Sequence, residues 1–327
     1  MTRPARVTRP ALAMLTLIAG CGGSIHGGSS AVERPVGEDL LALLPSGADA
    51  VIDVEVAQLD GWPTARRLLT LLPEEGRAQL AQLGDDPLAQ IQALAVAVHK
   101  AGTPDVGTTM VARGALDWDR LRAALTGAVE GEYHGATIVD GNTESMARIT
   151  PTVFAFGSRV AVRRVCDVAR KDDEGLRTAA VDKALRDALG RAPTAKLGRP
   201  AIMAAIVPTP PLREKLRTEK WQSAADLDWA AVSLAIGDGF DVGLIAAAHG
   251  PFEADSLTKL MKTRAVELKT QATVRLLGLV PFVEPFIVIA KEKEIHVAYR
   301  LTGVRVDQLV TRLEQMQGLG TRKAARP

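Results

Sequence analysis

The stretch LAVAVHKAGTPDVGTTMVARGALDWDRLRAAL, residues 94–125, decides the fold class of this 327-residue chain. Residues 94–98 and 109–113 are apolar runs of strand length, and the turn-forming sequence AGTPDVG lies between them. Gly114 ends the second run, and residues 118–125 then place apolar side chains at helical spacing. The stretch therefore predicts two strands joined as a hairpin and followed by a helix.

The same order of elements recurs along the chain, at residues 153–171, 230–268 and 286–316. A strand, a proline-containing connection and a basic helix at residues 48–72 are likewise repeated at residues 199–217. Helices that follow hairpins bury one face of an antiparallel sheet. We therefore predict an α+β fold in which antiparallel sheets are covered by helices, arranged as two similar lobes that arose by internal duplication.

The domain boundaries follow from this repetition. We expect a first lobe at residues 39–195 and a second at residues 196–317, with the seam in LGRAPTAKLGR, residues 189–199. Residues 318–327 are expected to form a disordered basic tail. The apolar stretch at residues 274–290 contains an arginine, a glutamate and two prolines, so it predicts a core helix, a proline-rich corner and a buried strand rather than a membrane span.

The composition excludes several classes of protein. Hydrophobic residues make up 47% and charged residues 24% of the chain, which excludes a disordered or collagen-like protein. Two cysteines are too few for a disulfide framework. A formal net charge of +2 gives no reason to expect a nucleic-acid partner, and with 4% aromatic residues few side chains could stack on bases.

The N-terminus has the features of a secretory signal. Three arginines precede an apolar stretch at residues 11–19, which is about half the roughly 20 residues needed to span a bilayer. The sequence Ile18-Ala19-Gly20-Cys21 follows, and it resembles the lipobox of bacterial lipoproteins. The resemblance implies that the lipoprotein signal peptidase recognises Ile18, Ala19 and Gly20 and cleaves off residues 1–20. It also implies that Cys21 carries diacylglycerol on its sulfur and a fatty acid such as palmitate on its amino group.

The sequence after Cys21 predicts the location of the protein. Residues 21–38 are rich in glycine and serine, which is typical of a flexible tether. In such lipoproteins an aspartate after the cysteine often signals inner-membrane retention, whereas this chain has Gly22. We therefore expect a lipid-anchored protein of the bacterial cell envelope, at the outer membrane and facing the periplasm. Loss of residues 1–20 removes three arginines and changes the formal charge from +2 to −1.

Sequence signatures of catalysis are absent. The chain contains no G-x-S-x-G, G-x-x-x-x-G-K-[ST], G-x-G-x-x-G or H-E-x-x-H sequence, and its five histidines have no ligand spacing. We therefore assign no catalytic residue, no cofactor-binding residue, no cofactor and no metal ligand. An enzyme would need a site assembled from distant residues, for example by convergence of His134, His249 and Asp53.

Three weaker candidates remain, each with a simpler alternative. Asp226 and Asp228 could offer oxygen ligands to a divalent cation, but a solvated turn is the preferred interpretation. Tyr133 and His134 could act as an acid–base pair, but a structural pair at a strand edge is preferred. Cys166 has arginines one helical turn away that could activate a thiol, but a small buried apolar side chain is preferred.

The tryptophans are interpreted in the same way. Each lies near the start of a predicted helix or strand, at positions 62, 118, 221 and 229. An exposed ligand-binding surface is one interpretation. Anchoring of helices on the sheet is the preferred one.

The body of the chain also resembles a group of proteins. LLPSGADAVIDVEVAQLD and VARGALDWDRL are similar to segments of bacterial envelope lipoproteins built from repeated hairpin-plus-helix units. That group has no established enzymatic activity, so the resemblance implies a non-catalytic protein. We expect a binding or scaffolding module whose partner is an envelope protein or the cell wall. The alternative is a carrier or sensor of an apolar ligand held within or between the lobes, and an enzyme is the third hypothesis.

Overall fold

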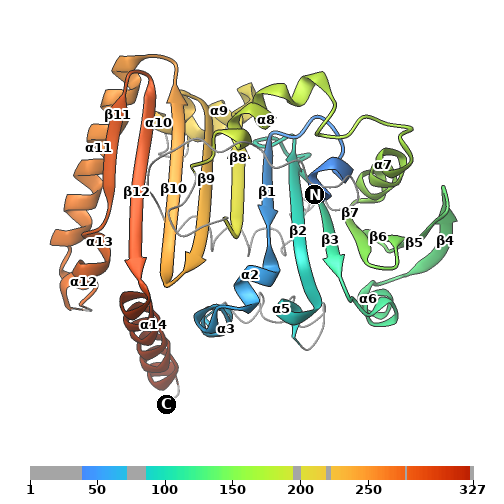
Figure 1. The fold of residues 1–327 in the computed structure, drawn as a ribbon, viewed down its shortest axis with the longest axis horizontal. Helices are drawn as coiled ribbons and strands as arrows, with labels where there is room; N and C mark the ends of the chain where they lie inside the picture. The colour runs from blue at the N-terminus through green and yellow to red at the C-terminus, as the bar shows by residue number, and fades with distance from the viewer. Residues whose placement is uncertain (1–38, 72–85, 194–199, 219–221, 277, 325–327) are drawn as a thin grey trace.

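The computed structural model describes residues 39–71, 86–193, 200–218, 222–276 and 278–324. These residues form one twelve-stranded sheet with helices around it (Figure 1). Every neighbouring pair of strands is antiparallel. The predicted α+β class with an antiparallel sheet covered by helices is therefore confirmed.

The first half of the sheet is built from residues 40–190. Its elements are η1 (Leu40–Leu43), β1 (Ala50–Val54), α2 (Val56–Asp60), α3 (Pro63–Thr70), α5 (Pro87–Gln90), β2 (Ile91–His99), β3 (Gly107–Gly114), α6 (Trp118–Ala124), β4 (Val129–Tyr133), β5 (Ala136–Asp140), β6 (Ser145–Thr150), β7 (Val153–Gly157), α7 (Arg159–Arg170), η2 (Ala180–Asp182) and α8 (Lys183–Gly190).

The second half is built from residues 202–324. Its elements are β8 (Ile202–Ile206), α9 (Pro210–Thr218), α10 (Gln222–Ala225), β9 (Leu227–Gly237), β10 (Gly239–Ala248), α11 (Pro251–Thr270), α12 (Ala272–Leu276), α13 (Val280–Val283), β11 (Ile287–Lys291), β12 (Glu294–Thr302) and α14 (Gly303–Ala324).

The two halves repeat one strand order. Outward from the middle of the sheet, one half runs β1-β2-β3-β7-β6 and the other runs β8-β9-β10-β12-β11. The halves join where β1 pairs with β8, with Ile52 opposite Ala204. The repeated order agrees with the duplication expected from the sequence, but the predicted lobes are halves of one continuous sheet rather than two separate sheets.

Side chains along a strand alternate between the faces of a sheet, and both faces are buried at β1, in the middle of this sheet. In β1, Val51 packs with η1, α7 and α8 on one face, whereas Ile52 and Val54 pack with α2, α5 and α6 on the other. Full burial of a valine or isoleucine side chain contributes about 1.5–3 kcal/mol. Helix α6 is also capped locally, since Asp117 accepts a hydrogen bond from the backbone N–H of Arg120 at its start.

Three sequence-based expectations need correction. Residues 153–171 form one strand and a helix, β7 and α7, rather than a hairpin followed by a helix. In residues 274–290, Leu276 is 86% exposed at the end of α12 and Ile287 is 53% exposed in the edge strand β11, so this stretch is not a core helix and a buried strand. The apolar pattern was local and did not reveal that this segment lies at the end of the sheet. Helix α14 continues to Ala324, so residues 318–324 are helical and not a disordered tail.

One further set of expectations concerns residues outside the described ranges, because residues 1–38 with the signal, Cys21 and the tether lie there. Within the described ranges, no helix combines the length and apolar character needed to cross a bilayer.

Candidate functional site

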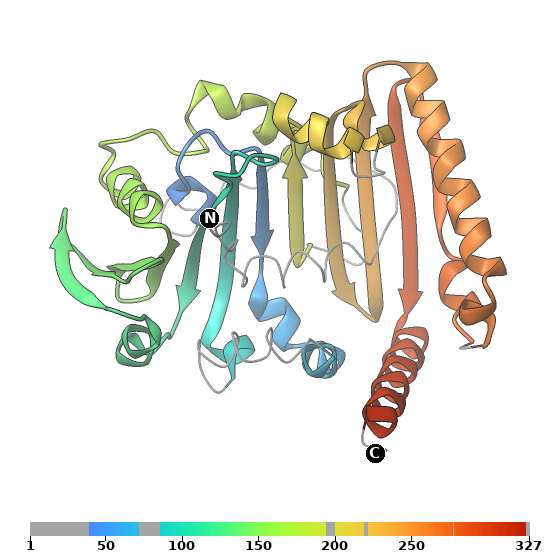
Figure 2. The same cartoon turned by 180° about the vertical axis from the view of Figure 1, so that it is seen from behind.

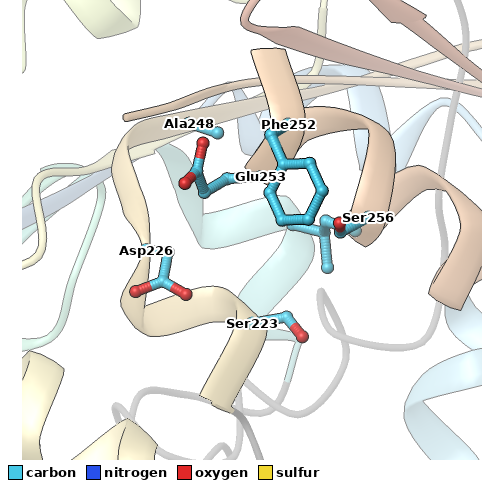
Figure 3. A pocket seen from close by; sticks show the side chains of 7 residues that line it. Ser223, Asp226, Ala248, Phe252, Glu253 and Ser256 are labelled. Atoms are coloured by element: carbon cyan, nitrogen blue, oxygen red, sulfur yellow. The ribbon is translucent and has the colours of Figure 1, made fainter. Parts of the chain in front are cut away.

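A pocket of about 210 Å³ lies at the start of α11, beside the ends of α10 and β10 (Figure 3). Its polar groups are the carboxylates of Asp226 and Glu253 and the hydroxyls of two serines. The apolar part includes Phe252, a residue that is 80% exposed. The complete lining is Ser223, Asp226, Ala248, Phe252, Glu253, Ser256 and Leu257.

The start of α11 shapes this pocket. Gly250 is the residue that precedes the helix, and Pro251 occupies the first helical position, where its missing N–H costs nothing. A Cβ atom on Gly250 would lie 2.8 Å from a carboxylate oxygen of Glu253, so the glycine lets that side chain fold back over the helix start. The carboxylate thereby stands where the partial positive charge of the helix N-terminus is greatest.

Next to the pocket, His249 links three segments of the second half. Its Nδ1 lies 2.5 Å from Asp228 Oδ1, and its Nε2 lies 3.0 Å from an Nη atom of Arg213. Because the arginine can only donate, Nε2 accepts and Nδ1–H donates to the carboxylate. The same guanidinium donates to the carbonyls of Ala225 and Pro208. Both ring nitrogens are therefore engaged in fixing α9 against β9 and β10.

The two predicted cation ligands, Asp226 and Asp228, lie beside basic side chains in this region. Asp228 is held by His249 and lies 4.0 Å from Lys293 Nζ, while Asp226 lies 4.0 Å from Arg217. Each carboxylate thus faces a basic group. Within the described ranges, no group of three or more acidic, histidine or cysteine side chains is arranged to hold a metal ion.

Tyr133 and His134 form a second cluster at the β4–β5 turn. Their rings stack with centroids 4.3 Å apart, and Arg163 lies over the tyrosine ring. His134 Nδ1 is 3.4 Å from carboxylate oxygens of both Asp167 and Asp172. Interaction with the Asp167 carboxylate raises the pKa of Tyr133, which disfavours its use as a base. The geometry is that of a structural contact between the hairpin turn and α7, as the preferred interpretation expected.

Cys166 is buried on the inner face of α7 and is 2% exposed. Burial is the main cause that raises the pKa of its thiol to about 11, and the neighbouring Asp167 adds to the increase. A thiol with such a pKa is almost entirely protonated at neutral pH and is a poor nucleophile. Cys166 therefore acts as a small apolar core residue, as preferred from the sequence.

Two of the tryptophans anchor helices on the sheet. The ring of Trp62, just before α3, meets Phe240 edge-on at 6.4 Å, and the ring of Trp118, at the start of α6, stacks near Phe154 at 6.3 Å. Trp229 lies under the guanidinium of Arg191. Anchoring is confirmed for the first two, while Trp221 lies outside the described residues.

The residues proposed for a hidden active site do not converge. His134 contacts α7 in the outer part of the first half, whereas His249 contacts Asp228 and Arg213 in the second half. Asp53 is buried in β1 at the junction of the halves, opposite Met203 of β8. The His249 network has no local sequence signature, because its members are up to 36 residues apart.

Comparisons with known proteins add distant structural likenesses. No protein-family model matches the chain, and no curated protein matches it in sequence. Among solved structures, the chain is similar to crystal form III of TP0453, with a TM-score of 0.49 and 12% identity over 85% of this chain and 98% of that chain. Crystal form I gives 0.46 and 11% over 85% and 97%, and crystal form IV gives 0.46 and 10% over 83% and 96%.

Proposed function

We propose that this chain is a membrane-anchored, non-catalytic lipoprotein of the bacterial envelope that serves as a binding or scaffolding module facing the periplasm. The observation that carries the proposal is the resemblance of residues 18–21 to a lipobox. The glycine- and serine-rich residues 22–38 separate it from the first described residue, Asp39. The duplicated sheet after this linker provides a large folded surface and a pocket, and the candidate residues His134 and His249 lie in ion pairs with aspartates.

The two other hypotheses are less well supported. An apolar ligand requires an apolar cavity, whereas the described pocket at the start of α11 contains two carboxylates and two hydroxyls. An enzyme assembled from His134, His249 and Asp53 requires these side chains to meet, and their contacts lie in different parts of the sheet.

The anchor is tested by comparing the two cysteines of the chain. Cys21→Ala should abolish incorporation of an alkyne-labelled fatty acid and release an unlipidated form from membranes. Cys166→Ala is the matched control and should leave labelling and fractionation unchanged, because that thiol is buried in the fold. Normal processing and membrane attachment of Cys21→Ala would refute the lipid anchor.

Sorting between the inner and the outer membrane is tested at Gly22, the residue after Cys21. Gly22→Asp should move the lipoprotein from the outer-membrane to the inner-membrane fraction in a density gradient, without changing fatty-acid labelling.

The binding role is tested by cross-linking in cells followed by purification under denaturing conditions. Failure to recover any reproducible partner would count against a binding module.

A further inference from the structure

The two ends of the sheet are protected differently. At one end, α11 lies along the edge strand β11 and is the outermost element in both views (Figures 1 and 2). At the other end, β4 is the last strand, and no described helix or strand lies beyond it in either view. Strand edges expose unpaired backbone groups that can pair with another chain. The β4 edge is therefore the open edge of the described sheet.

The hairpin that forms this edge is not part of the duplicated scaffold. It lies in the chain between α6 and β6, and the second half has α12 and α13 between the corresponding α11 and β11. The common strand order ends at β6 and at β11, and only the first half continues with β5 and β4. The open edge is thus a feature that one half has in addition to the repeated core.

The pairing register shows which backbone groups face outward. Tyr133 and Ala136 flank the two-residue turn of the hairpin, and such a pair exchanges both of its backbone hydrogen bonds. Bonded and non-bonded pairs alternate along an antiparallel ladder, so Gly131 and Val129 also bond to β5. The N–H and C=O groups of Glu130 and Glu132 therefore point to the open edge.

The side chains of β4 present a different chemistry on each face. Glu130 and Glu132 share one face, where Arg122 of α6 pairs with the first of them at 2.8 Å. Val129, which is 69% exposed, shares the other face with Gly131 and Tyr133.

Gly131 is not required by the packing of the hairpin itself. A Cβ atom built there would find only the Ile138 side chain, at 4.0 Å. A glycine in an edge strand leaves room for a large side chain of a neighbouring strand to pack over it. The face between Val129 and Tyr133 thus has room for a large side chain over Gly131.

We propose that the β4 edge is a strand-addition site for an extended segment of an envelope protein in which basic residues alternate with large apolar residues. The basic residues lie opposite Glu130 and Glu132, and an aromatic or aliphatic residue between them lies over Gly131. This inference rests on the proposed binding function and names the surface that performs it. A second copy of this chain fits less well, because antiparallel pairing of two β4 strands brings their glutamates together.

Peptides provide the direct test with the purified full-length protein in detergent. The probe is TKFKVT, whose two lysines and central phenylalanine match the pattern of the edge. The first control is TEFEVT, in which like charges meet. The second control is TKFKVT methylated on both lysine backbone nitrogens, which keeps the charges but removes two donors to the edge. We expect N-methylation to weaken binding by about tenfold or more.

Protein variants then locate the site. The double variant Glu130→Gln/Glu132→Gln should weaken TKFKVT binding by about twofold to thirtyfold through loss of two cross-strand charge pairs. Glu132→Pro removes an outward N–H that the hairpin does not use, so it should reduce binding further while the protein stays folded. Glu174→Gln, which removes a carboxylate outside the β4 edge, is the matched control and should bind as the wild type does.

The outcomes separate this inference from the proposed function. Saturable binding of TKFKVT, with slower amide exchange at Glu130 and Glu132, supports strand addition. Strand addition would be overturned by equal binding of the N-methylated peptide, by unchanged binding to Glu132→Pro, or by no binding at all. It would also be overturned by amide protection at β11 instead of β4, or by concentration-dependent dimers formed through β4. None of these results depends on Cys21, so an intact lipid anchor with a partner bound elsewhere would refute the edge site alone.

Discussion

Asp182→Ala should destabilise the fold more than any surface charge change, because this carboxylate joins segments far apart in sequence. Asp182 is 2% exposed at the end of η2 and accepts hydrogen bonds from the backbone N–H groups of Gly47 and Ala48 at 3.0–3.2 Å. Backbone bonds between Leu44 and Leu176 and between Ser46 and Glu174 hold the same two segments together. The carboxylate therefore fixes the approach of the chain to β1.

The expected loss of stability follows from the backbone N–H groups of Gly47 and Ala48, which lose their acceptor in Asp182→Ala. Each buried N–H left unsatisfied costs about 1–3 kcal/mol. Burial raises the pKa of Asp182, which shows that desolvation of its charge opposes these bonds and reduces the net loss. We expect the free energy of unfolding to fall by about 2–4 kcal/mol for Asp182→Ala. For Asp182→Asn we expect a fall of about 1–2 kcal/mol, since the amide keeps one oxygen acceptor.

The assay is equilibrium urea unfolding followed by far-ultraviolet circular dichroism. Asp187→Ala is the matched control one turn further along α8, because Asp187 is 59% exposed and pairs only with the exposed Lys183. Exposed helix pairs contribute about 0.3–0.5 kcal/mol. Equal losses for Asp182→Ala and Asp187→Ala, or a loss for Asp182→Asn as large as for Asp182→Ala, would refute the reasoning.

Three further predictions address other sites. Burial lowers the pKa of His99 below its usual 6.5, so the folded state keeps the ring neutral while the unfolded chain takes up a proton. The free energy of unfolding should therefore fall as the pH drops from about 7.5 through 6.5, and His99→Gln should reduce this dependence when measured by urea unfolding at several pH values. Cys166, with a pKa of about 11, should resist iodoacetamide at pH 8 in the native protein and react at once in urea, which mass spectrometry can follow. Gly114→Ala places a Cβ atom 2.1 Å from the carbonyl oxygen of Gln90, so it should lower the melting temperature measured by circular dichroism. Gly131→Ala is the control, because its Cβ atom meets nothing nearer than 4.0 Å, and it should leave the melting temperature unchanged or raise it.

Local patterns predicted many elements of the fold, although residues 153–171 form one strand and a helix, β7 and α7, rather than a hairpin and a helix. The hairpin and helix at residues 94–125 appear as β2, β3 and α6 because alternation of apolar residues and turn chemistry act over a few positions. The repetition of element order also agrees with the common strand order of the two halves. What local patterns could not predict is the pairing of β1 with β8, since this contact joins strands about 150 residues apart.

The same limit applies to features of the surface. Ile287 and Ile289 have the apolar character of core residues, yet they are 53% and 41% exposed because β11 lies at the end of the sheet. The glutamates of β4 have no distinguishing sequence signal, because nothing in the sequence marks an edge strand. The His249 network was hidden for a related reason, since its arginine, aspartate and histidine come from three different elements.

The differences between the halves are the places where a duplicated scaffold can acquire a function. In the second half α11 has 20 residues, its start forms the described pocket, and it lies along β11. In the first half the corresponding α6 has 7 residues and is followed by the hairpin that leaves β4 open. A helix that covers one edge prevents indiscriminate pairing there, while an uncovered edge with two glutamates repels a second copy and favours a basic strand. One duplicated sheet therefore has a protected end and an end suited to a specific extended partner.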